Sequence, residues 1–261
     1  MHLLPFLSLC LSPLISMAAP NISSAPSSSA SPSATCAPAA PASDSHLASP
    51  SFLRFLSTQF PSTSKLANPY TYISGIVFAS TNHAEAAGFV HNTTVPACES
   101  IKYREALYKT AVLYGAPRMI NSLLACGPTT GEAKKTRRNP RESVEELERR
   151  GVELFNSTYG ETAKVTRERL STIHPDFDYM MMTLVYGPIY GFDDVLGEME
   201  TSFAMIAALI GADAPLQTSW HVAGAMRHGA TKEEVDAVLR IAEYTKKRVN
   251  GEKVPGFEED L

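Results

Sequence analysis

Residues 217–235 read QTSWHVAGAMRHGATKEEV, and this stretch decides the architecture expected of the chain. Positions four and seven apart share one face of an α-helix, so Gln217, His221 and His228 are predicted to lie along a single stripe. His228 stands at the predicted helix end, where a cation interacts favourably with the helix dipole. The stretch therefore predicts a helix of mostly small residues that presents a histidine on one face.

The same stretch also contains the signals that end one helix and begin another. Gly229 suits the left-handed conformation that commonly follows a helix end, because glycine has no side chain to clash there. Thr231 and Glu234 have the Ser/Thr-x-x-Glu spacing of a capping box, which marks the start of a helix. The sequence thus predicts two consecutive helices joined by a short turn, with His221 held on a rigid hairpin.

Helical signals recur along the chain, while period-two alternation typical of strands is scarce, so we expect an all-α fold. Two segments, each led by a glutamate and closed by Gly-Ala, resemble each other and suggest two related helical halves. The predicted helices span residues 51–58, 68–90, 98–113, 117–126, 143–157, 159–172, 176–187, 194–211, 215–228 and 231–249.

The N-terminal part of the chain has a different composition. Between residues 19 and 50, 25 of 32 residues are Ser, Ala or Pro, which is too little apolar surface to offset the entropy of ordering the backbone. We therefore expect residues 1–50 to form a signal-like segment and a disordered leader, and residues 51–261 to form a single helical domain. The apolar run 3–15 is too short to span a bilayer, so no stable membrane insertion is expected.

Composition also limits the kinds of partner. The 261-residue chain has a formal net charge of −4 and a pI near 6.0, which provides no basic field for nucleic acid. The four cysteines include no Cys-x-x-Cys pair, and the histidines are too scattered to argue for a metal. No glycine-rich phosphate loop occurs either. We expect no cofactor, no metal and no nucleic-acid partner.

Three residues are candidates for catalysis. An imidazole titrates close to neutral pH, so His221 is the preferred proton donor. Glu200 precedes an apolar helical run, where a carboxylate needs a partner; it either pairs with the histidine or stabilises the helix N-terminus. Gln217 lies one turn before His221 and is expected to orient a substrate carboxylate or carbonyl group. A buried structural histidine is the alternative for His221.

The order of helix, histidine, His-Gly-Ala-Thr and Lys-Glu-Glu-Val resembles the carboxymuconolactone decarboxylase family, which includes alkylhydroperoxidase D-like proteins. The resemblance covers about residues 150–245. It implies an alkylhydroperoxidase D-like helical bundle, a homotrimer or hexamer, and cofactor-independent decarboxylation or isomerisation of a small cyclic carboxylic acid or lactone. Decarboxylases of this family commonly carry a glutamate at the place of Gln217, which bears on whether the site is active.

Two other functions remain open at this stage. In the resembling peroxidases, two thiols occupy the places of Ala214 and Gln217, so their absence here argues against thiol-based peroxide reduction. A helical oligomer that binds a ligand without catalysis is the third reading. Localisation is also open: residues 1–18 resemble a secretory signal, Met17 offers an intracellular start, and the C-terminal residues are not the tripeptide of peroxisomal import.

Overall fold

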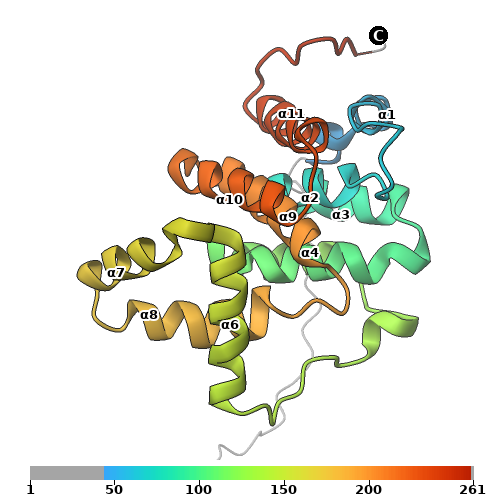
Figure 1. Ribbon diagram of the computed structural model, residues 1–261. Coiled ribbons are helices and arrows are strands. Elements are labelled where there is room, and N and C mark those ends of the chain that lie inside the picture. The colour runs from blue at the N-terminus through green and yellow to red at the C-terminus, as the bar shows by residue number, and fades with distance from the viewer. Residues whose placement is uncertain (1–43, 260–261) are drawn as a thin grey trace, which may run out of the picture. The chain divides into compact units, whose positions relative to one another are not determined.

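The computed structural model describes residues 44–259, which form one unit that is entirely helical apart from turns and loops (Figure 1). The all-α prediction is confirmed. The α-helices and the π-helix η5 are α1 (Pro50–Ser57), α2 (Tyr70–Ser80), α3 (Ala84–Thr94), α4 (Ser100–Tyr114), α5 (Ala116–Ala125), α6 (Val144–Tyr159), α7 (Ala163–Ile173), α8 (Phe177–Tyr179), η5 (Met180–Tyr190), α9 (Glu198–Gly211), α10 (Pro215–Arg227) and α11 (Lys232–Val249). Short 3₁₀ helices are η1 (Asp44–Ala48), η2 (Ala97–Glu99), η3 (Gly131–Lys134) and η4 (Gly160–Thr162).

The hairpin expected from residues 217–235 is formed by α10 and α11. Gly229 has a φ of 97°, the left-handed conformation that its position required. The Thr231 side chain accepts a hydrogen bond from the Glu234 amide at 3.2 Å, and the Glu234 carboxylate accepts one from the Thr231 amide at 2.9 Å. This reciprocal pair satisfies two amides at the start of α11 and fixes where the helix begins.

The segment 68–90, expected as one helix, is instead divided into α2 and α3. Asn82 separates them with a φ of 69°, and its amide donates to Ala79 O at 3.0 Å. Asparagine adopts the left-handed region more readily than most residues, so it ends α2 without the usual glycine. The break lets α2 and α3 pack against each other, which a single helix of that length could not do.

The predicted helix 176–187 is mostly a π-helix, η5, which contains Pro188. A proline has no amide hydrogen and its ring clashes with the preceding turn of an α-helix. In η5 the ring is accommodated within a wider turn, and the Gly191 amide donates to Tyr186 O, five residues back, at 2.7 Å. The next helix, α9, begins at Glu198 rather than at 194, after the loop 191–197.

Two hydrophobic clusters organise the unit. The larger one is built mainly from α1 to α4, α9 and α11, and Leu47 and Ala48 are buried in it, so residues before 51 take part in the folded unit. The smaller cluster joins α6 and η5 to Met205 of α9. In Figure 1, α6, α7 and α8 lie together on one side of the bundle. The smaller cluster forms walls of the cavity described below.

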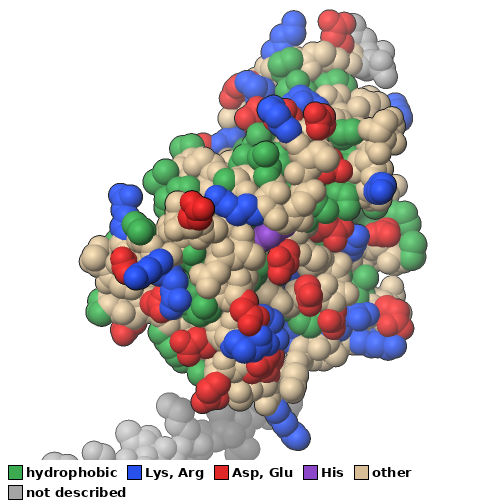
Figure 2. All heavy atoms as spheres, viewed as in Figure 1, with side chains coloured by type: hydrophobic (Ala, Val, Ile, Leu, Met, Phe, Trp, Pro, Cys, Tyr) green, Lys and Arg blue, Asp and Glu red, His purple; other side chains and the backbone are tan. Residues whose placement is uncertain are grey.

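The face shown in Figure 2 carries no large area of one charge. On the face shown in Figure 2, Lys and Arg side chains alternate with Asp and Glu side chains. This agrees with the modest net charge of −4. Among the helices within residues 44–259, none has the length and apolar character needed to cross a membrane.

Candidate active site

His221 lies on the inner face of α10, with only 3% of its surface exposed. Its ring stands edge-on to the Tyr159 ring, with 6.0 Å between the ring centroids. The Nδ1 atom is buried and forms no hydrogen bond with any described residue. A buried polar atom without a partner is costly, and because His221 also lines a cavity, a ligand that reaches Nδ1 can supply the missing hydrogen bond.

His221 lines a cavity of about 620 Å³ between α6, α7, η5, α9 and α10. A cavity of this size can hold a small organic molecule. Most of its wall is aromatic or aliphatic. Trp220 contributes to this wall, and its ring stands edge-on to Tyr159. The polar lining residues are Tyr159, Thr162, Thr166, Arg169, Tyr186, Tyr190, Gln217, Ser219, His221 and Arg227.

Gln217 and His221 are brought together by the structure, as their spacing of one helical turn predicted. Both line this cavity, His221 from its buried wall and Gln217 from an exposed position. The amide of Gln217 is therefore placed where it can orient a ligand that enters from solvent.

Three tyrosines line the buried end of the cavity. Burial raises the pKa of Tyr159 and of Tyr186, and the interaction between their side chains lowers the pKa of Tyr159 and raises that of Tyr186. Tyr190, stacked edge-on against Tyr186 with centroids 5.1 Å apart, has a buried hydroxyl with no hydrogen-bond partner among the described residues. Burial raises the pKa of Tyr190 far above its ordinary value, so the phenol keeps its proton at neutral pH.

The electrostatics of the cavity favour an anionic ligand. Burial, and to a smaller degree the charge of nearby His228, lowers the pKa of His221 to about 4, so the empty site holds a neutral imidazole at pH 7. None of the described lining residues is acidic, whereas two are arginines. Arg227 donates to Thr158 O at 2.6 Å, while the exposed Arg169 guanidinium forms no ion pair with a described residue.

Glu200 is not brought into this cavity. Its carboxylate pairs with Lys102 at 2.8 Å and accepts a hydrogen bond from the Gly197 amide at 3.4 Å, as a residue in the first turn of α9. It lines a separate, smaller pocket beside Tyr72 and Tyr103. The alternative reading of Glu200 as a helix-terminus residue describes its contacts, and the structure contains no Glu200–His221 proton relay.

His228 also has partners of its own. Its Nδ1 is 3.1 Å from Ser202 Oγ, and its Nε2 is 3.1 Å from Ser157 Oγ and 3.5 Å from Glu198 Oε2. These contacts join α6 and α9 to the end of α10, and His228 is absent from the cavity lining. Its contacts are those of a residue that holds three helices together, and a positive charge on it lowers the pKa of His221.

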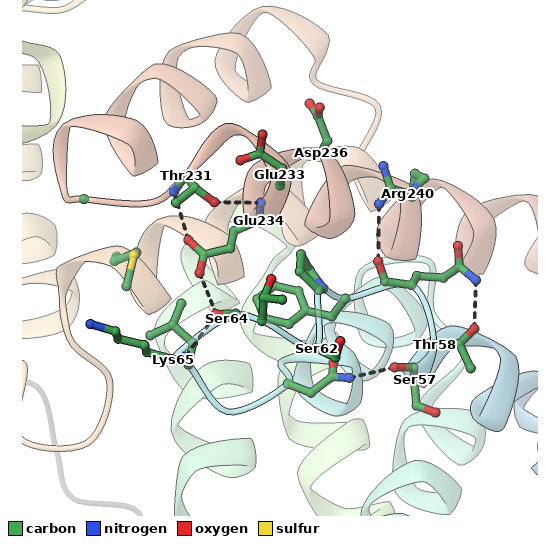
Figure 3. Close-up of a pocket in the computed structure, with 18 residues that line it drawn as sticks. Ser57, Thr58, Ser62, Ser64, Lys65, Thr231, Glu233, Glu234, Asp236 and Arg240 are labelled. Atoms are coloured by element: carbon green, nitrogen blue, oxygen red, sulfur yellow. Dashed lines mark hydrogen bonds between the residues drawn. The ribbon is translucent and has the colours of Figure 1, made fainter.

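A larger cavity of about 1220 Å³ lies between the loop 58–68 and α11 (Figure 3). Its central carboxylate, Glu234, is already engaged by the Thr231 amide and by Ser64 Oγ, the latter at 2.5 Å. Arg240 likewise donates to Gln59 O at 3.2 Å. The Glu234 and Arg240 side chains of this cavity therefore already have protein partners, whereas the Nδ1 atom of His221 has none among the described residues. No cluster of three metal-ligating side chains occurs within residues 44–259.

The sequence is similar to two yeast proteins, both named Peroxisomal protein 2. The Saccharomyces cerevisiae protein is 30% identical, and the alignment covers 54% of this chain and 59% of that protein. The Schizosaccharomyces pombe protein is 33% identical over 54% of this chain and 67% of that protein. The chain belongs to the Peroxisomal protein 2 family. It spans less than two thirds of the length of the Saccharomyces cerevisiae relative.

Membership of the Peroxisomal protein 2 family establishes kinship without assigning a reaction. No family model matches the chain, so the resemblance to carboxymuconolactone decarboxylases stays an expectation. No solved structure matches it either.

Proposed function

We propose that the His221 cavity is the active site of a cofactor-independent lyase or isomerase that acts on a small cyclic carboxylic acid or lactone. The observation that carries this proposal is the buried, unpartnered Nδ1 atom of His221, a residue that lines a largely apolar cavity. Gln217 orients the substrate, and Arg169 attracts its negative charge to the mouth. In an apolar site a leaving carboxylate is poorly solvated, which favours loss of carbon dioxide.

His221 obtains its proton when the substrate binds. In the empty site its pKa is about 4, but a carboxylate placed beside a buried imidazole favours the charged form and raises that pKa. Binding is then accompanied by uptake of one proton. Because binding takes up a proton, the affinity for the anionic substrate falls as pH rises. The fall is about tenfold per pH unit between the pKa of His221 in the empty site, about 4, and its raised pKa in the complex.

The first test replaces the proton donor. Release of carbon dioxide, or loss of substrate, is measured with a panel of cyclic carboxylic acids and lactone carboxylates for the native chain and for His221→Gln. We expect turnover to fall by roughly two to four orders of magnitude, because general acid catalysis contributes about that much. Calorimetry in buffers of different ionisation enthalpy is expected to show proton uptake on binding to the native chain and none with the variant.

A folded H221Q chain that retains the native rate would remove the imidazole from the reaction. Binding of the same acids without turnover by the native chain would favour the alternative of a non-catalytic ligand-binding protein. Thiol-based peroxide reduction receives no support from the described thiols: Cys98 is exposed, Cys126 is buried, both are free, and neither lines the His221 cavity.

Location and assembly are further parts of the proposal. The name shared by the two relatives supports a peroxisomal location for this chain. Separate N-terminal and C-terminal fluorescent fusions, compared with a peroxisomal marker, test this, and exclusion of both from the organelle would contradict it. The resemblance drawn from the sequence supports a homotrimer or hexamer. Light scattering coupled to size-exclusion chromatography tests that assembly, and a monomeric mass at micromolar concentration would contradict it.

A further inference from the structure

Tyr190 presents the second unsatisfied polar atom of the cavity. The residue is 1% exposed, it lines the same cavity as His221, and its hydroxyl has no hydrogen-bond partner among the described residues. Its raised pKa means that this hydroxyl is a donor at neutral pH rather than a base. A ligand that brings an acceptor atom to this hydroxyl group therefore satisfies a buried donor that the described residues leave without a partner.

A buried lysine holds the main chain at Tyr190 in place. Lys109 is completely buried, and its ammonium group donates to Tyr190 O at 3.1 Å, to Leu196 O at 3.2 Å and to Thr201 Oγ1 at 2.8 Å. These bonds tie the end of η5 and the following loop to α4 and α9. On its other side the Tyr190 ring packs edge-on against Tyr186. The hydroxyl is thus held in place before a ligand arrives, as electrostatic catalysis requires.

We propose that Tyr190 donates a hydrogen bond to the carbonyl oxygen of a substrate in which a ketone or lactone carbonyl lies β to the carboxylate. This inference rests on the proposed function and names its substrate class. The bond between the α-carbon and the carboxylate breaks, carbon dioxide leaves, and the electron pair forms an enolate whose oxygen is stabilised by Tyr190. The His221 imidazolium then protonates the α-carbon, so that one keto-acid anion and one proton give one ketone and one carbon dioxide.

The binding test uses salicylate, a stable mimic of the enol form of a β-keto acid, and benzoate, which lacks the enol oxygen. We expect the native chain to bind salicylate about tenfold more tightly than benzoate, the difference that a hydrogen bond to a buried donor provides. In Tyr190→Phe the affinity for salicylate falls because its hydrogen bond is lost, while the affinity for benzoate is unchanged. The two affinities therefore become equal within a factor of about two. Tyr114→Phe is the matched control, since the Tyr114 hydroxyl bonds to Leu107 O outside the cavity.

The turnover test uses 2-oxocyclohexanecarboxylate with the same variants. Y190F is expected to lower kcat by about two orders of magnitude with little change in KM, as loss of an oxyanion donor does. Its melting temperature stays the same or rises, because the substitution removes an unsatisfied buried group. A merely structural role would instead lower the melting temperature and leave the salicylate preference intact, and that result would overturn the proposal.

The two inferences fail in different ways. If turnover depends on His221 but Y190F is as fast as the native chain, the role of Tyr190 is refuted while the proposed function stands. If the native chain shows no turnover but its salicylate preference is lost only in Y190F, the role of Tyr190 in recognising the oxygen stands and the proposed reaction fails.

Discussion

At the scale of single residues, Glu200 forms a structural ion pair, whereas His221 is the residue proposed to transfer a proton. The Glu200 carboxylate is held by Lys102 and lines another pocket, so Glu200→Gln leaves the proton path at His221 intact. We predict a change in turnover of less than about threefold and a loss of about 0.5–1 kcal/mol in unfolding free energy, typical of a partly exposed ion pair. Steady-state kinetics and urea unfolding measure both quantities.

His221→Gln is the comparison for this variant. If E200Q slowed turnover as strongly as H221Q does, Glu200 would have to reach the proton path through a rearrangement on ligand binding. If the turnover of E200Q fell in proportion to its folded fraction, as measured by urea unfolding, the effect would come from a weakened start of α9 and not from the proton path.

The residues that could be predicted from the sequence are those whose neighbours lie on the same helix. Gln217 and His221 share a face because four residues make one turn, and both line the cavity. Glu200 could not be placed in this way, because its partner Lys102 is 98 residues away in the chain. The missing hydrogen bonds at Tyr190 and His221 are likewise properties of packing between helices, which no local pattern reveals.

At the scale of elements, the crossing of α6 and η5 depends on two glycines. A Cβ at Gly151 would stand 2.0 Å from Met182 O, and one at Gly187 would stand 2.2 Å from Leu147 O. In both cases the obstacle is backbone, which cannot move aside as a flexible side chain does. The two helices therefore approach as closely as their main chains allow, and this contact sets the wall that carries Tyr186 and Tyr190.

We predict that Gly187→Ala lowers the free energy of unfolding by about 1–3 kcal/mol, the cost of overpacking. This cost outweighs the better helix propensity of alanine. Gly197→Ala is the matched control, because a Cβ there meets nothing within 4 Å, and we expect a change within about 1 kcal/mol. Urea unfolding measures both variants. Equal stability of the G187A and native chains would show that the two helices are not in the close contact described.

The elements themselves were predictable to different degrees. Capping signals located α11, because Thr231 and Glu234 act on amides within four residues. The division of 68–90 at Asn82 was missed, since asparagine tolerates a left-handed conformation without demanding one. The π-helix was also missed: Pro188 signals a disturbed helix, but whether it kinks, ends or widens depends on the packing of η5 against α6.

At the scale of the whole molecule, the cavity lies where the smaller hydrophobic cluster meets α10. Tyr159, Tyr186, Tyr190 and Met205 belong to that cluster and also line the cavity, so the same side chains stabilise the fold and shape the site. The all-α class followed from the recurring helical signals and from the scarcity of the period-two alternation typical of strands. The division into two clusters did not, because it depends on which apolar faces meet across long separations in the chain.

The buried imidazole also gives the whole molecule a pH-dependent stability. The pKa of His221 is about 4 in the folded chain and near 6.5 in the unfolded chain, so the unfolded state binds more protons between these values. Stability is therefore lost as pH falls from about 6.5 towards 4. The difference amounts to about 3 kcal/mol once both states are protonated, and about 2 kcal/mol of it is lost by pH 5.

Urea unfolding of the native chain and of His221→Leu at pH 7 and pH 5 measures this contribution. His91 and His228 also have lowered pKa values, mainly through burial, so both proteins lose some stability in acid. The native chain is expected to lose about 2 kcal/mol more than H221L over this interval, because leucine is similarly apolar but does not titrate. Equal losses would mean that the imidazole is solvated in the folded chain. The same result would remove the neutral, unpartnered His221 on which the proposed proton uptake depends.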